Sequence, residues 1–214
     1  MANSPSADSH DYGALFIVSA PSGAGKTSLV KAVLERVEHI SVSISHTTRA
    51  KRPKEKHGVN YHFVDTATFE DMIARREFFE YAHVFGRYYG TSHRAISDKR
   101  YHGEDVILEI DWQGARQACS AAPEAISIFI LPPSREALES RLHSRGQDAP
   151  ETIARRMQDA ISEISHYNEF DYVIINDDFN AALRDFEAII HAERVRRERV
   201  AKAQRALLEA LVTA

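Results

Sequence analysis

The chain has 214 residues, of which 27% are charged, and a formal net charge of −4. This length suits one domain, or one domain with insertions, that buries a hydrophobic core. The negative charge argues against a nucleic-acid partner, because general binding to nucleic acids needs a basic surface. The single cysteine, Cys119, excludes an internal disulfide and a metal site made of several cysteines. It also suits a reducing compartment, so we expect a cytoplasmic protein.

Residues 1–13 are rich in Ser, Asp and His and lack the basic start and apolar centre of a secretory signal, so we expect a disordered tail. No apolar run approaches the roughly 20 residues that span a bilayer. We therefore expect a soluble protein without a membrane partner. The eleven histidines show no spacing typical of a zinc site.

The first predicted element is a strand over residues 15–18, followed by a glycine-rich loop and a helix. The strand is apolar without alternation, as in a parallel strand that is covered on both faces. The loop reads Ala20, Pro21, Ser22, Gly23, Ala24, Gly25, Lys26, Thr27 and Ser28. This order predicts a phosphate loop, in which backbone N–H groups and Lys26 bind nucleotide phosphates and the Thr27 hydroxyl binds Mg²⁺.

Ala20 stands where the pattern of a phosphate loop has its first glycine. A methyl group is compatible with extended backbone at the end of a strand, and the two glycines nearest the phosphates are present. The alternative is a chance glycine-rich turn between a strand and a helix. The flanking strand and helix favour the phosphate loop.

After this helix we expect a strand over residues 39–44 and then a polar loop over residues 45–58, which contains five basic residues. Most charged segments are solvated loops, and the composition alone favours that interpretation. The alternative is an anion site made by Arg49 and Arg52, because a guanidinium group fits a phosphate.

The segment that follows predicts a short strand at 61–64, a helix at 66–76 capped by Asp65, and two strands at 78–85 and 87–91. Residues 45–91 would then form a small mixed unit inserted between 14–44 and 92–214. Its residues with polar groups that could line a pocket are Tyr61, Glu80, Tyr88 and Tyr89.

The alternation of helix and strand resumes with a helix at 93–101 and a strand at 105–110, which ends at Asp111. Proteins with a phosphate loop often place an acidic residue at such a strand end to orient Mg²⁺. The alternative is that Asp111 caps the next helix, and the two roles are compatible.

A strand at 125–131 and a helix at 134–143 capped by Ser134 precede a short basic loop and a further helix capped by Asp148. Arg141, Arg145 and Arg156 lie on both sides of this loop. Arginines near a closing lid suit phosphoryl transfer, because they stabilise the charge on the moving group. The alternative is that each is an exposed arginine at a helix end.

The last predicted elements are a strand at 172–175 and a long helix from about residue 181 towards the C-terminus, capped by Asp177 and Asp178. The end of this helix is apolar at Leu207, Leu208 and Leu211. Packing in the core or a contact between two copies explains this pattern better than a helix on a membrane surface.

Residues 15–194 resemble bacterial guanylate kinases in six motifs that occur in this order. They are residues 19–27, Ser45-His46-Thr47-Thr48-Arg49 with Arg52 and Pro53, Tyr88-Tyr89-Gly90-Thr91, Ile110-Asp111-Trp112-Gln113-Gly114, Arg145-Gly146-Gln147-Asp148 and Asn176-Asp177-Asp178. The resemblance implies a three-layer α/β fold with a central parallel sheet, a GMP-binding insert over 45–91 and a lid over about 141–156. It implies transfer of the γ-phosphoryl group of ATP to GMP, with Mg²⁺, in purine nucleotide metabolism.

The resemblance also implies a role for single residues. ATP would meet residues 20–28 and Asn176. GMP would meet Ser45, Glu80 and Thr91 through its base, Arg49, Arg52, Tyr61 and Tyr89 through its phosphate, and Asp111 on the acceptor and metal side. The residues implied in catalysis are Lys26, Arg141, Arg145 and Arg156.

Guanine suits these side chains, because its N1–H and 2-amino donors match the Glu80 carboxylate and its O6 matches the Ser45 hydroxyl. Adenine reverses this pattern, so we expect discrimination on the order of a thousandfold against AMP. Glu109 stands where the family commonly has Asp, which leaves a metal role for Glu109 open. Acceptance of dGMP and the choice between monomer and homodimer also stay open.

Two other functions are compatible with the pattern. The fold of guanylate kinases also serves as a binding module without catalysis, but such a module needs neither Lys26 nor the lid arginines. The second alternative is a kinase of the same build that acts on another phosphorylated acceptor, such as a ribosyl bisphosphate.

Overall fold

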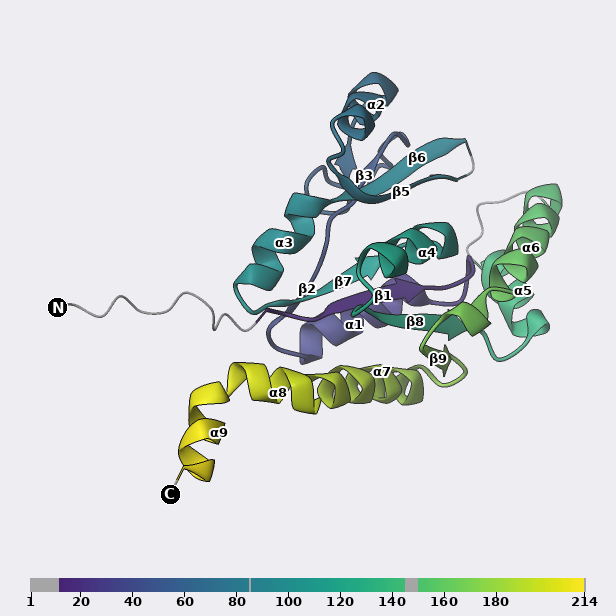
Figure 1. Cartoon of the computed structure of the whole chain (residues 1–214). Coiled ribbons are helices and arrows are strands. Elements are labelled where there is room, and N and C mark those ends of the chain that lie inside the picture. Colours follow the sequence, from purple (N-terminus) through teal and green to yellow (C-terminus); the bar gives the residue numbers. More distant parts are fainter. Residues whose placement is uncertain (1–11, 85, 145–149, 214) are drawn as a thin grey trace.

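The computed structural model describes residues 12–84, 86–144 and 150–213, which form two sheets and a set of surrounding helices (Figure 1). The strands are β1 (Leu15–Ser19), β2 (Ile40–Val42), β3 (His46–Thr47), β4 (His62–Phe63), β5 (Phe78–Val84), β6 (Arg87–Ser92), β7 (Asp105–Glu109), β8 (Ile126–Leu131) and β9 (Tyr172–Ile175). The helices are α1 (Lys26–Arg36), α2 (Thr66–Ala74), α3 (His93–Tyr101), α4 (Trp112–Ala121), α5 (Arg135–Ser144), α6 (Pro150–Ile164), α7 (Phe179–Arg194), α8 (Arg197–Ala203) and α9 (Arg205–Val212), with a 3-10 turn at Tyr167–Glu169. Apart from Tyr12 and Gly13, the predicted tail lies outside the described residues.

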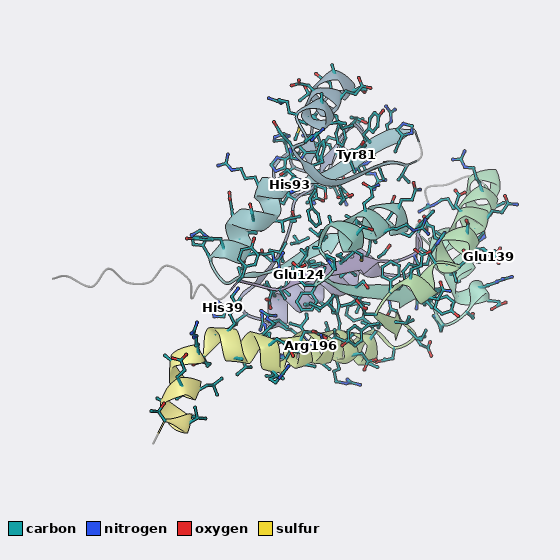
Figure 2. The ribbon with its side chains drawn as sticks, viewed as in Figure 1. His39, Tyr81, His93, Glu124, Glu139 and Arg196 are labelled. Carbon is teal, nitrogen blue, oxygen red and sulfur yellow. The ribbon has the colours of Figure 1, made fainter. Side chains whose placement is uncertain are left out.

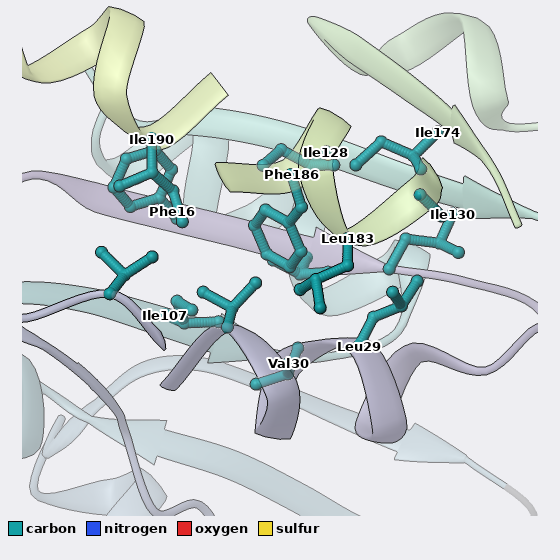
Figure 3. Packing of buried hydrophobic residues seen from close by; sticks show 14 of the residues in the cluster. Phe16, Leu29, Val30, Ile107, Ile128, Ile130, Ile174, Leu183, Phe186 and Ile190 are labelled. Atoms are coloured by element: carbon teal, nitrogen blue, oxygen red, sulfur yellow. The ribbon is translucent and has the colours of Figure 1, made fainter. Parts of the chain in front are cut away.

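The central sheet has the strand order β2-β7-β1-β8-β9, and all of its neighbouring strands are parallel. Side chains of β1 alternate between its two faces. Phe16 and Val18 pack with α1 and α7, whereas Leu15 and Ile17 pack with α3 and α4. Figure 3 shows the first of these clusters, in which Ile190 of α7 lies beside Phe16 of β1. This confirms the predicted three-layer α/β fold with a central parallel sheet.

The second sheet has the strand order β4-β3-β6-β5 and mixes parallel and antiparallel pairs. In Figure 1 it lies on the same side of the central sheet as α3 and α4. Its core is a stack in which the ring of Phe69 in α2 lies 4.3 Å from Phe78 and 5.1 Å from Tyr88. Tyr88 is therefore part of this core, and its predicted place in a pocket is wrong.

One strand of this sheet was expected to be loop. β3 lies within the polar segment 45–58, where its two residues pair with Gly90 and Tyr89 of β6. The Thr47 hydroxyl donates to the Tyr88 carbonyl over 2.9 Å, which gives this buried polar side chain a partner. Two residues are too few to show the alternation of a strand, so the sequence pattern could not reveal β3.

The predicted helix caps at Asp65, Ser134 and Asp178 are confirmed, whereas Asp177 was predicted to share the capping of α7 and the cap residue is Asp178 alone. Asp65, Ser134 and Asp178 each accept a hydrogen bond from the backbone N–H three residues later, over 2.7, 3.1 and 2.7 Å. Such bonds satisfy a donor that the first turn of a helix leaves unpaired. The predicted cap at Asp148 lies outside the described residues.

The C-terminal segment is not the single long helix that was expected. It breaks between α7 and α8, next to Arg196 (labelled in Figure 2), and again at Gln204. The break lets two arginines bind one carboxylate, because Arg194 Nε and Arg199 Nη2 lie 2.7 and 3.1 Å from opposite oxygens of buried Asp105. Residues five apart in a continuous helix would point about 140° apart.

The apolar end of this segment is exposed in α9. Leu207, Leu208 and Leu211 are 53%, 38% and 71% exposed, so the predicted packing of these residues in the core is wrong. A contact between two copies through them stays a prediction. Among the described residues, no helix combines the length and the apolar character needed to cross a membrane.

Candidate active site

The phosphate loop joins β1 to α1 and has the conformation that its glycines permit. Gly23 and Gly25 have φ angles of 96° and 97°, which residues with a side chain rarely adopt. A Cβ atom on Gly25 would lie 2.4 Å from Asn176 Nδ2. α1 begins directly at Lys26, so the N–H groups at the positive end of the helix open towards the loop.

The side chains of Lys26 and Thr27 reach the end of the neighbouring strand β7. Lys26 Nζ donates to the Ile110 carbonyl over 2.7 Å, and the Thr27 hydroxyl donates to a carboxylate oxygen of Glu109. These contacts follow from the parallel pairing of β1 with β7, which sets Val18 opposite Glu109. Asp111 caps α4 by accepting from the Gly114 N–H over 2.8 Å, so the predicted capping role is confirmed.

Three predicted residues meet in the second sheet, where Glu80 of β5 lies opposite Thr91 of β6. The hydroxyl groups of Ser45 and Thr91 are 2.9 Å apart, and both residues are buried. Glu80 is only 3% exposed, and its Oε1 has no hydrogen-bond partner among the described residues. Burial raises the pKa of Glu80 to about 7. Hydrogen bonding to Thr91 opposes this rise in part, the charge of Asp111 adds to it, and the charge of Lys26 opposes it.

A cavity of about 340 Å³ joins the phosphate loop to this part of the second sheet. Its walls include Gly23, Lys26, Thr27, Ser45, Tyr61, Glu80, Tyr89, Glu109 and Asp111. Residues that are far apart in the chain therefore face one space, with phosphate-binding backbone on one side and a buried carboxylate on the other. Thr91 and Ala24 are fully buried, and Thr91 touches Ser45.

An adjoining cavity of about 460 Å³ shares Thr27, Ser45, Tyr61, Tyr89 and Glu109 with the first and also contains Arg49 and Arg52. Burial raises the pKa of Tyr61 to about 12, so its hydroxyl keeps its proton and can donate.

Two of the predicted lid arginines contact the phosphate loop or its support. Arg156 donates to the Ser22 hydroxyl over 2.8 Å, and Arg141 donates to the Asn176 carbonyl over 2.8 Å. The Asn176 amide in turn donates to the Ala24 carbonyl over 2.7 Å, so this side chain holds the loop. Arg145 lies outside the described residues.

Sequence analysis missed Glu163 of α6, which also lines the cavity of about 340 Å³ and lies near Lys26. Its Oε2 accepts from the backbone N–H of Ser22 over 3.0 Å, and burial raises the pKa of its carboxyl. Glu163 lies seven residues after Arg156, which is two turns of a helix and therefore the same face. That spacing was visible in the sequence, although the contact with Ser22 was not.

Comparisons with known proteins agree with this geometry. The family model described as guanylate kinase matches residues 12–193. A guanylate kinase from Chromohalobacter salexigens is 60% identical over 201 residues, which cover 94% of both chains. One from Vibrio cholerae is 58% identical over 202 residues, covering 94% of this chain and 98% of the other. The crystal structure of a guanylate kinase from Anaplasma phagocytophilum, 34% identical, superposes with a TM-score of 0.77 over 93% of this chain and 95% of the other.

Proposed function

The chain belongs to the guanylate kinase family, and we propose which of its residues perform each part of that family's reaction. The enzyme transfers the γ-phosphoryl group of ATP to GMP, giving ADP and GDP. The observation that carries the assignment of residues is the Glu80 carboxylate. It is buried, lacks a partner on Oε1 and shares a cavity with the phosphate loop.

Guanine binds at Glu80, Ser45 and Thr91. The base presents two adjacent donors, N1–H and the 2-amino group, which a carboxylate accepts together, and an O6 that accepts from the Ser45 hydroxyl. A buried acceptor without a partner costs roughly 1–3 kcal/mol, which binding of guanine recovers. Adenine offers no donor at N1 and leaves this cost in place, so AMP is rejected.

The GMP phosphate binds at Arg49, Arg52, Tyr61 and Tyr89 in the adjoining cavity. Arg49 and Tyr61 lie close together, with the guanidinium carbon 5.5 Å from the centre of the tyrosine ring. The rings of Tyr61 and Tyr89 are 6.0 Å apart. Two guanidinium groups and a protonated phenol are the donors that a dianionic phosphate requires.

ATP binds at residues 20–28, and Asn176 supports this loop through its hydrogen bond to the Ala24 carbonyl. Lys26, Arg141, Arg145 and Arg156 stabilise the charge on the transferring group. An oxygen of the GMP phosphate attacks the γ-phosphorus in line, and the bond to the bridging oxygen of ADP breaks. No side chain acts as nucleophile, so catalysis consists of positioning and charge stabilisation.

Mg²⁺ fits beside Thr27, where the Thr27 hydroxyl and the Glu109 carboxylate meet. Both are oxygen donors, the kind that Mg²⁺ prefers. No group of three or more His, Cys, Asp or Glu suited to a metal occurs in the part of the chain that the structure describes, which agrees with an ion bound chiefly by nucleotide phosphates and water. When bound, Mg²⁺ neutralises charge on the β- and γ-phosphates.

An assay of ADP release tests this assignment, with ATP and Mg²⁺ and with GMP, AMP or a sugar phosphate as the acceptor. We expect turnover with GMP and a rate on the order of a thousandfold lower with AMP. Turnover of the sugar phosphate without turnover of GMP would overturn the guanine site. A location in the cytoplasm, the absence of nucleic-acid and membrane partners, and a monomeric or homodimeric state remain predictions.

A further inference from the structure

We propose that Glu55 is a positioning residue for the acceptor phosphate, because its carboxylate fixes the Arg49 side chain and the backbone at Arg52 before GMP arrives. Glu55 lies in the loop between β3 and β4, three residues after Arg52 and six after Arg49. The inference rests on the proposed function, since it assumes that Arg49 and Arg52 bind the phosphate of GMP.

Both oxygens of Glu55 are used in this loop. Oε1 accepts from Arg49 Nη2 over 2.7 Å, and Oε2 accepts from Arg49 Nη1 over 3.0 Å. Oε2 also accepts from the backbone N–H of Arg52 over 2.8 Å, and the Glu55 N–H donates back to the Arg52 carbonyl over 3.0 Å. One carboxylate therefore sets the direction of the Arg49 side chain and the path of the backbone at Arg52.

The ion pair is partly shielded from solvent. The side chains of Arg49 and Glu55 are 17% and 16% exposed, so water screens this pair less than a pair on the open surface. The Arg49 guanidinium also lies 5.5 and 5.7 Å from the ring centres of Tyr61 and Phe63. These contacts hold a long side chain in one orientation next to a proposed phosphate ligand.

In this orientation, Glu55 does not contact the edge of the Arg49 guanidinium group that would bind the phosphate. Glu55 and the Ala50 carbonyl accept three of its five N–H donors, two on Nη1 and one on Nη2. The remaining two, on Nε and Nη2, form the side fork of the guanidinium group, which suits two oxygens of a phosphate. Tyr89 lies near this group. Glu55 thus binds one edge of the Arg49 guanidinium group and leaves the other edge for the phosphate.

The alternative is that Glu55 competes with the phosphate for Arg49. The two functions predict opposite effects of Glu55→Gln, which removes the charge but keeps the size of the side chain. If Glu55 positions Arg49, the substitution weakens GMP binding about tenfold or more, since Arg49 must then be ordered by the ligand. If Glu55 competes, the substitution tightens GMP binding.

The test compares binding of GMP and of guanosine to the full chain and to Glu55→Gln. Guanosine lacks the phosphate, so we expect its affinity to stay within about twofold while GMP loses about tenfold or more and KM for ATP is unchanged. Glu70→Gln is the matched control, because Glu70 is an exposed acid on α2 of the same unit. In an Arg49→Ala background, Glu55→Gln should cause no further loss, because the amide oxygen of Gln can still accept from the Arg52 N–H and the effect of the lost charge passes through Arg49.

Three results would overturn the inference: tighter GMP binding in Glu55→Gln, unchanged GMP binding, or an equal loss of guanosine, which would indicate general damage to the unit. A further loss in the Arg49→Ala background would also contradict it. Failure of the proposed function is distinguishable from these results. In that case Arg49→Ala alone would bind GMP as tightly as the unsubstituted enzyme does.

Discussion

Gly114 in the first turn of α4 leaves the space that the Glu80 carboxylate occupies. A Cβ atom on Gly114 would lie 2.6 Å from Glu80 Oε2 and 3.4 Å from Asp111 Oδ1. Real side chains do not approach so closely, so any residue but glycine would displace the carboxylate. Gly114 belongs to a motif that was noted in the sequence, but its role becomes visible only when α4 is placed against β5.

Gly114→Ala should therefore damage guanine recognition without destabilising the fold. We expect KM for GMP to rise about tenfold or more, because Glu80 must rotate away from the base. The melting temperature should not fall, since alanine favours a helix over glycine by about 1 kcal/mol. Steady-state kinetics and thermal unfolding check both parts, with Ser120→Ala on the exposed side of α4 as control.

Glu80→Gln should lower GMP turnover far more than it lowers ATP affinity. The amide presents an N–H where guanine also presents a donor, and one unsatisfied buried group costs roughly 1–3 kcal/mol. We expect kcat/KM for GMP to fall about a hundredfold while KM for ATP changes less than about twofold. Equal activity of the variant with GMP would remove Glu80 from the base site.

The raised pKa of Glu80 predicts a pH dependence of GMP binding. The carboxylate accepts from guanine only when it is ionised, and in the free enzyme its pKa is about 7. GMP affinity should therefore weaken as the pH falls below about 7, and GMP binding near neutral pH should release a proton. Titration calorimetry in buffers of different ionisation enthalpy measures that proton. Glu80→Gln should show neither effect.

As the pH rises, the stability of the folded enzyme should change in the direction opposite to its affinity for GMP. Between the ordinary glutamate pKa of 4.5 and the folded-state pKa of about 7, folded Glu80 keeps a proton that the unfolded chain has released. Its contribution to the free energy of unfolding therefore falls as the pH rises through this window, by on the order of 3 kcal/mol. Urea unfolding should show that Glu80→Gln gains stability relative to the unsubstituted enzyme as the pH rises from about 5 to about 8.

Features that depend on neighbouring residues could be predicted from the sequence. The phosphate loop needs only two glycines between an apolar strand and a helix, and the caps at Asp65, Asp111 and Asp178 need only the backbone N–H three residues later. Each of these features depends on residues within about ten positions of one another in the chain. Such local features make up most of the central sheet and one wall of the cavity.

Features that depend on distant residues could not be predicted. The two-residue strand β3 exists because β6 offers it a partner. His46 pairs with Gly90, 44 residues later, and Thr47 pairs with Tyr89, 42 residues later. The break after α7 lets Arg194 and Arg199 bind the carboxylate of Asp105, which lies 89 residues before Arg194. The periodicity of apolar residues in the sequence does not indicate such long-range contacts.

Lys26→Ala should give a folded protein with little activity. Among the described residues the Lys26 side chain makes one hydrogen bond, to the Ile110 carbonyl, so its loss costs only about 1 kcal/mol of stability. Its charge acts on the transferring phosphate, and we expect kcat to fall on the order of a thousandfold. Lys31→Ala, an exposed position of the same helix, is the control. A fully active Lys26→Ala enzyme would contradict the assignment of residues 20–28 as a catalytic phosphate loop.

Glu163 of α6 has two effects on the phosphate loop that substitution can separate. Its Oε2 accepts from the Ser22 N–H, which orders the loop, whereas its negative charge lies near Lys26 and opposes an incoming phosphate. Glu163→Gln keeps an acceptor oxygen and removes the charge. Glu163→Ala removes both and leaves the Ser22 N–H without this acceptor.

We expect Glu163→Ala to raise KM for ATP about tenfold. Leaving the Ser22 N–H without its acceptor costs roughly 1–3 kcal/mol. Removing the negative charge of Glu163 contributes less, because solvent screens its repulsion of the phosphate. Glu163→Gln should keep KM for ATP within about twofold, and KM for GMP should change little in either variant. Glu139→Gln, at an exposed position of α5 (Figure 2), is the control. If both Glu163 variants raise KM for ATP equally, the charge and not the hydrogen bond is what the loop requires.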